Sequence, residues 1–220
     1  MDSTSLYQKY YVYNSQACNT PKEFLYNSKK LRKLQSLPAR AIDLLEIRAW
    51  ITLGEMKKAF QMLKQAKRLL DFSHDNFYLG HYYLLENMLI SATSTASDMI
   101  MENLKSADHH LKECGSKALE CDILVAKALA NPADMEITAY EDSLKQAMQL
   151  ALETDLPDLM ICVYLAYILV YQSHQLPNLA EREIQMLRLM IEKNQHRFRY
   201  IQLLNQSAIN QMMLKDYKAA

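Results

Sequence analysis

The sequence predicts an all-α protein, and three observations support this prediction. Leu, Met, Ala, Lys, Glu and Gln, all strong helix formers, dominate the chain. Only three of the 220 residues are glycine, and no Asn-Gly or Asp-Gly pair separates stretches of alternating polar and apolar residues, as a β-hairpin would require. The third observation is a short leucine-containing motif that recurs at a nearly constant spacing.

Proline and capping residues indicate where the helices begin. Thr20-Pro21-Lys22-Glu23 predicts a helix start, with threonine as the N-cap, proline at the first helical position and a glutamate that can bond back to the cap. Asn131-Pro132-Ala133-Asp134 predicts a second start. Further breaks are expected at 36–38, 71–75, 91–97, 114–117, 155–157, 174–177 and 193–195. These breaks leave about ten helices of roughly 12 to 18 residues.

The recurring motif is a leucine followed three residues later by an alanine. Residues three apart share one face of a helix, so a large and a small side chain are expected where a neighbouring helix packs closely. The copies are Leu63-Lys64-Gln65-Ala66, Leu104-Lys105-Ser106-Ala107, Leu144-Lys145-Gln146-Ala147 and, without the alanine, Leu187-Arg188-Leu189-Met190. A period of about 40 residues predicts a stack of helix pairs.

The segment 50–66 contains the clearest copy, in which a glycine permits a tight turn between two helices. It resembles a tetratricopeptide repeat, whose second helix opens with Gly-Asp-Tyr-x-x-Ala and continues to a large residue and another alanine. The positions that match are Gly54, Ala59, Leu63 and Ala66. Glu55 and Met56 replace the usual aspartate and tyrosine. The resemblance covers about 39–220, with a period longer than the usual 34 residues and no turn glycine in the later copies.

This resemblance implies a right-handed superhelical array, an α-solenoid, of about five antiparallel helix pairs. The expected units are 1–37, 38–75, 76–115, 116–156, 157–194 and an incomplete unit 195–220. Because the last segment looks like half of a repeat, we expect the chain to be a fragment of a longer protein.

In such an array, the first helices of the units line a concave groove that binds a peptide or protein. The groove positions expected from the register are Asp43, Arg48, His81, Asn87, Lys127, Tyr164, Gln202 and Asn205. A basic cluster is the second candidate and contains Lys29, Lys30, Arg32 and Lys33. We interpret it as an exposed helical face or a contact for an acidic peptide, with nucleic-acid binding as the alternative.

The charge balance argues against nucleic acid or an anionic membrane as partner. Basic and acidic residues number 25 each, so no long-range field attracts a polyanion. Leu159 to Tyr171 is an apolar run of about 13 residues, too short to span a bilayer, and we expect a buried helix there. The four cysteines form no CxxC pair, and without a signal segment the chain is expected in the cytoplasm or nucleus.

Two groups of residues leave a choice between core and surface. Tyr7, Tyr10, Tyr11 and Tyr13 line a binding groove or cap the first repeat, and the sequence favours neither. Methionines adapt well to varied partners, but those within apolar helical runs are expected to pack in the core. These are Met62, Met99, Met101, Met148, Met160 and Met186.

No pattern of catalytic chemistry stands out. His109, His110 and Cys114 come nearest to a metal site, with Cys121 on the next helix, but we interpret them as ordinary surface and packing residues. The acidic pairs Glu141/Asp142 and Asp134/Glu136 are expected on a solvated face. The sequence therefore predicts no enzyme, no cofactor and no metal site.

The function expected is that of a scaffold or adaptor that binds a protein or peptide, as a subunit of a larger complex. The alternative is a regulatory region of a larger enzyme or assembly. Separase and subunits of the anaphase-promoting complex carry divergent helical arrays of similar look, an analogy at the level of fold only.

Overall fold

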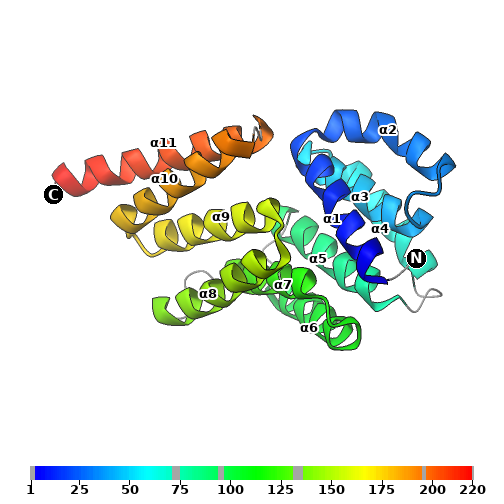
Figure 1. Ribbon diagram of the computed structural model, residues 1–220. Coiled ribbons are helices and arrows are strands. Elements are labelled where there is room, and N and C mark those ends of the chain that lie inside the picture. The colour runs from blue at the N-terminus through cyan, green and yellow to red at the C-terminus, as the bar shows by residue number, and fades with distance from the viewer. Residues whose placement is uncertain (1–2, 71–74, 94–96, 131–135, 195–196, 220) are drawn as a thin grey trace. The chain divides into compact units, whose positions relative to one another are not determined.

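The computed structural model describes residues 3–70, 75–93, 97–130, 136–194 and 197–219. Within these ranges it contains eleven α-helices and no strand (Figure 1), which confirms the all-α prediction. The expected helix start at 131–134 lies outside the described residues. None of the helices in the described ranges combines the length and apolar character that crossing a membrane requires.

The chain forms two compact units, 1–119 and 120–220. The helices up to the boundary are α1 (Ser3–Asn19), α2 (Pro21–Lys33), α3 (Ala39–Thr52), α4 (Met56–Leu70), α5 (Asn76–Thr93) and α6 (Ser97–Cys114). The boundary falls within the first turn of α7 (Lys117–Ala130). The helices after it are α8 (Ile137–Thr154), α9 (Pro157–Ser173), α10 (Pro177–Asn194) and α11 (Arg197–Ala219).

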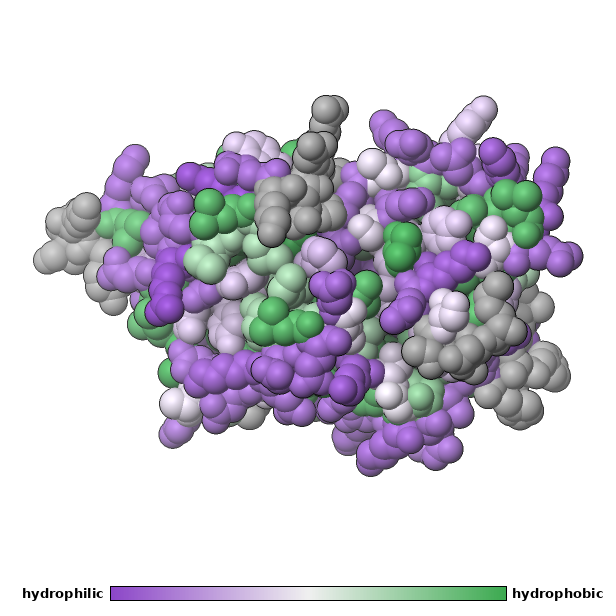
Figure 2. All heavy atoms as spheres, in the orientation of Figure 1, coloured by the Kyte–Doolittle hydropathy of each residue, from purple (hydrophilic) through white to green (hydrophobic). Residues whose placement is uncertain are grey.

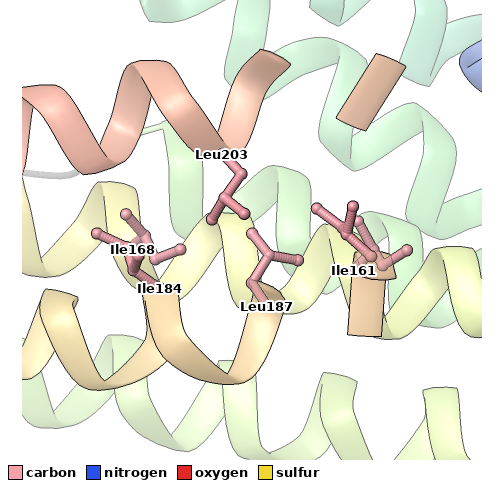
Figure 3. Packing of buried hydrophobic residues seen from close by; sticks show 6 residues of the cluster. Ile161, Ile168, Ile184, Leu187 and Leu203 are labelled. Atoms are coloured by element: carbon pink, nitrogen blue, oxygen red, sulfur yellow. The ribbon is translucent and has the colours of Figure 1, made fainter. Parts of the chain in front are cut away.

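Each unit is built around one central helix that packs against several others. In the first unit, α3 packs against α1, α2, α4 and α5, and Ile42, Leu44 and Leu45 are fully buried on it. In the second unit, α9 packs against α8, α10 and α11. Figure 3 shows the second core, in which Ile161 and Ile168 of α9 meet Ile184 and Leu187 of α10 and Leu203 of α11. The apolar run Leu159 to Tyr171 is therefore a buried helix, as predicted.

The recurring motif marks the buried face of α4, α6, α8 and α10. Leu63 and Ala66 on α4, Leu104 and Ala107 on α6, and Leu144 and Ala147 on α8 are all buried. On α10, Leu187 is fully buried and Met190 packs against the core beside it. The prediction that these pairs lie on the packed side of their helices is confirmed by their burial. The two side chains share that side because they are three residues apart.

Helix ends recur in one hydrogen-bonded form. After α3, the backbone N–H of Gly54 donates to Ile51 O and that of Glu55 to Trp50 O, with Gly54 at φ +77°. After α9, Gln175 at φ +56° makes the same pair of bonds to Gln172 O and Tyr171 O through its own and the next N–H. This is the Schellman motif, in which a left-handed residue closes the helix. The same turn therefore forms after α9, although glutamine and not glycine is at the left-handed position.

Two local expectations are wrong. The Thr20 side chain does not cap α2, because its hydroxyl donates to Gln16 O in the preceding helix. Met99, Met101 and Met186 are exposed rather than packed, because they lie beside, and not on, the buried stripe of their amphipathic helices.

The N-terminal tyrosines belong mainly to the core of the first unit. Tyr10 and Tyr11 are buried, and both pack edge-on against Phe77 of α5. Tyr7 stacks on the same ring with centroids 3.9 Å apart. These contacts fasten α1 to α5. Tyr13, two residues after Tyr11, is half-buried.

Candidate protein-binding surfaces

Arg48, an expected groove residue on α3, binds side chains of two other helices. Its Nε donates to Sγ of Cys18 on α1 at 3.2 Å, and its Nη1 donates to Sδ of Met88 on α5. The guanidinium is half-buried. Arg48 therefore links α1, α3 and α5, and its role in the first unit is to hold these three helices together.

His81 on α5 lies inside the first unit and is only 5% exposed. Its ring packs against Tyr10, Tyr11 and Phe77. Burial, together with the positive charge of Arg48, lowers the pKa of His81 to about 3. The imidazole is therefore neutral at physiological pH, and no partner can touch it in this conformation.

The two remaining groove candidates of the first unit differ, because Asn87 is buried and Asp43 forms an ion pair. Asn87 is buried, and its Oδ1 accepts no hydrogen bond from the part of the chain that the structure describes. Asp43 forms an ion pair with Arg32 on α2, with 2.6 Å between its Oδ1 and the Arg32 Nη2. The same nitrogen lies 2.9 Å from Oε2 of Glu46. Burial lowers the pKa of the Arg32 guanidinium, but the hydrogen bonds and charges of these two carboxylates outweigh it and raise the pKa.

The groove candidates of the second unit differ in exposure. Lys127 on α7 and Asn205 on α11 are exposed. Tyr164 is partly buried and packs against the isoleucine core of α9 and α10. Gln202 accepts a 2.9 Å hydrogen bond from Arg199, whose Nη2 reaches Sγ of Cys162 on α9. Asp43, Arg48, His81 and Tyr164 therefore contact other helices within their own units, whereas Lys127 and Asn205 are exposed.

The residues considered for metal binding or acid–base chemistry are not brought together. Nδ1 of His110 lies 2.8 Å from Oδ1 of Asn76, and its ring stacks on Tyr83. Among the described residues, no three His, Cys, Asp or Glu side chains gather in a metal-binding arrangement. Glu141 accepts a hydrogen bond from the Tyr171 hydroxyl, whereas Asp142 is exposed. Glu136 is exposed as well, and its partner in the pair, Asp134, lies outside the described residues.

Helix α11 presents an apolar surface that the sequence reasoning missed. Ile201, Leu204 and Met212 are 55%, 47% and 60% exposed, and Ala208 is exposed between them. We call these four residues the α11 outer face. Figure 2 shows hydrophobic residues reaching the surface over the α9–α11 part of the second unit.

The opposite side of α11 is fastened to the unit. Leu203 and Asn210 are fully buried, and Nδ2 of Asn210 donates to Pro177 O and to a carboxylate oxygen of Glu181 on α10. Leu203 is two residues from Ile201, which in an α-helix means nearly the opposite side. The helix therefore has one side that is covered within the unit and an apolar outer face that is not.

A helical projection of α11 would have revealed this second face. From Tyr200 to Leu214 the chain contains no Asp, Glu, Lys or Arg, whereas a helix with one solvated side normally carries charges there. That uncharged run was the available signal. No protein-family model, curated protein or solved structure matches this chain significantly.

Proposed function

We propose that this chain is a tetratricopeptide-like α-solenoid scaffold of the cytoplasm or nucleus that binds another protein. The observation that carries the proposal is the α11 outer face, with Ile201 and Met212 more than half exposed on a stretch of α11, 200–214, that has no charged residue. Contiguous exposed apolar surface on a folded unit is characteristic of protein-interaction sites.

The chemistry of this face defines the partner. Because the face is apolar and has no charged residue along its length, it suits an amphipathic helix whose contacting side chains are aliphatic or aromatic. Such a helix would lie along α11 and bury its i, i+3/i+4 and i+7 residues there. A charged partner face would lose its hydration without gaining an opposite charge.

A non-catalytic role agrees with the surroundings of the reactive side chains. His81 is neutral and enclosed by aromatic rings, and His110 is held by Asn76. Cys121 is buried, and burial raises the pKa of its thiol, which keeps the unreactive protonated form at physiological pH. These groups are placed for packing.

Site-specific photo-crosslinking in cells tests the proposal. A photoreactive amino acid replaces Met212 on the α11 outer face or, as the control, Leu152 on α8, which is 59% exposed and equally apolar. We expect a discrete adduct with one other protein at position 212 and none at 152, and its loss in the Ile201→Glu background. Equal labelling at both positions, or no adduct at 212, would refute α11 as the binding face.

A further inference from the structure

Helix α2 of the first unit carries a basic face that its own fold does not use. Pro21, Phe24 and Ser28 are buried on one side of the helix. Successive steps of four, three and four residues place a second set on the opposite side. Its members, which we call the α2 basic face, are Lys22, Tyr26, Lys29 and Lys33, with Lys30 at the edge, and all are exposed.

The arginine of this cluster behaves differently from the lysines. Arg32 turns towards α3 and forms ion pairs with Asp43 and Glu46, so it belongs to the fold. Lys22, Lys29, Lys30 and Lys33 have no carboxylate partner among the residues that the structure describes, and Glu23 is the sole acidic residue of α2. The basic cluster of the sequence thus divides into one structural cation and a row of unpaired ones.

Helix stability does not account for this row. Positive charges in the last turn interact favourably with the helix dipole, which suits Lys30 and Lys33. Lys22 is in the first turn, where the same dipole opposes a positive charge. Its alignment with Lys29 and Lys33 therefore points to a ligand that runs along the whole helix.

Tyr26 lies in the middle of the row and is 84% exposed. An aromatic ring this exposed contributes little to folding, whereas tyrosine is enriched at the centres of protein interfaces. The aliphatic parts of the flanking lysine side chains enlarge the apolar surface around the ring. Figure 2 shows hydrophilic side chains projecting from the α2 side of the first unit.

We propose that the α2 basic face binds an acidic segment of a partner protein. Lys22 to Lys33 spans about 17 Å of helix, which matches roughly five residues of an extended peptide or three turns of a helix. The carboxylates of such a segment would pair with the lysines, and one apolar residue would cover Tyr26. This face is separate from the α11 outer face, so each proposal can fail without the other.

The chemistry favours an acidic protein segment over nucleic acid. The chain has zero net charge, so it lacks the field that draws in a polyanion. The unpaired cations are lysines, which act as point charges, while the fork of Arg32, the geometry that binds phosphate in two places, is already occupied by carboxylates.

Fluorescence anisotropy with defined probes tests the proposal. The first probe is a labelled peptide of about twelve residues with alternating Glu and Ala around a central Leu. The second has Gln in place of every Glu, and the third is labelled oligothymidylate of equal charge. Each is titrated with the full chain, with the Lys22/Lys29/Lys30/Lys33→Gln variant, and with a control that removes four exposed lysines elsewhere, Lys57/Lys67/Lys105/Lys112→Gln.

We expect the Glu peptide to bind in a salt-sensitive manner, about tenfold more weakly to the α2 variant and within about twofold of normal to the control. Tyr26→Ala should weaken binding about fivefold. Three results would overturn the proposal: equal binding of the Gln peptide, an equal loss in the control variant, or no binding at all. Tighter binding of oligothymidylate would assign the face to nucleic acid instead. Circular dichroism of each variant shows that the helices are intact.

Discussion

The imidazole ring of His81 lies 4.6 Å, centroid to centroid, from the phenol ring of Tyr10, and the two rings join α5 to α1 inside the first unit. Phe77 completes the contact at 4.7 Å from the imidazole. Burial in this apolar setting is the main reason that the pKa of His81 falls to about 3, and the charge of Arg48 adds to it. The packed core therefore disfavours the protonated form of His81.

His81 should make the stability of the protein depend on pH. In the unfolded chain its pKa is about 6.5, whereas in the folded state it is about 3. Between these values the unfolded state binds a proton that the folded state refuses, so stability falls as the pH drops below about 6.5. The limiting slope for one proton is about 1.4 kcal/mol per pH unit.

Urea unfolding between pH 7 and pH 4.5 measures this effect. In His81→Phe the imidazole is replaced by a ring that suits its aromatic neighbours and cannot titrate. We expect the free energy of unfolding of the variant to depend less steeply on pH than that of the unmodified protein. The difference should correspond to the uptake of one proton. Parallel pH profiles of the two proteins would show that His81 is not the group responsible.

Gly54 and Gln175, which follow α3 and α9 and have a positive φ, should respond in opposite ways to substitution. Gly54→Ala places a side chain at φ +77° and should destabilise the protein by about 1 kcal/mol, since nothing but backbone conformation opposes it. Gln175→Gly relieves the same strain at φ +56° and should stabilise by about 0.5 to 1 kcal/mol. Thermal unfolding measures both.

A glycine placed within a helix provides the control for this pair. Gln61 on α4 is exposed and helical, and Gln61→Gly should destabilise by about 1 kcal/mol. If Gln175→Gly destabilised to the same degree, the left-handed turn after α9 would be wrong.

These turns show why the sequence could predict an all-helical fold but not its details. The Leu–Ala motif was readable because burial of a helical face imposes a fixed spacing on residue type. The turn after α9 was not, because glutamine at φ +56° gives no compositional signal. Likewise, four basic residues adjacent in the sequence could not reveal that Arg32 alone reaches Asp43 and Glu46, since that depends on where α3 lies.

The close approach of α7 and α8 can be tested at Ala147. This residue is fully buried, and its carbonyl accepts a hydrogen bond from Sγ of Cys121 at 3.3 Å. Ala147→Leu should overpack this contact and cost about 1 to 3 kcal/mol. The neighbouring Gln146 is exposed, so Gln146→Leu is the matched control and should change the urea midpoint little. Equal effects of the two would contradict the assigned register of α8.

Substitutions of Arg32 and Lys29 should distinguish a charge that stabilises the fold from one that only lies on the surface. Arg32→Gln breaks the ion pairs to Asp43 and Glu46 and should lower the free energy of unfolding by about 1 kcal/mol, a modest value because the side chain is a third exposed. Lys29→Gln removes the same charge from an exposed position and should have no measurable effect. Only the first difference should shrink as salt is added to the urea titration. Equal losses in the two variants would place Arg32 on the surface with the lysines.

Adjacent leucines on α11 test whether the helix truly has one covered and one open face. Leu203 is fully buried in the core of the second unit, so Leu203→Ala should cost about 2 to 5 kcal/mol through lost burial and the cavity left behind. Leu204 on the α11 outer face is 47% exposed, and Leu204→Ala should cost less than about 1 kcal/mol while weakening any photo-crosslink at position 212. Urea unfolding of the two single variants makes the comparison with the same chemical change one residue apart. If Leu204→Ala were as costly as Leu203→Ala, the outer face would be packed within the protein itself and unavailable to a partner, and the scaffold proposal would lose the surface on which it rests.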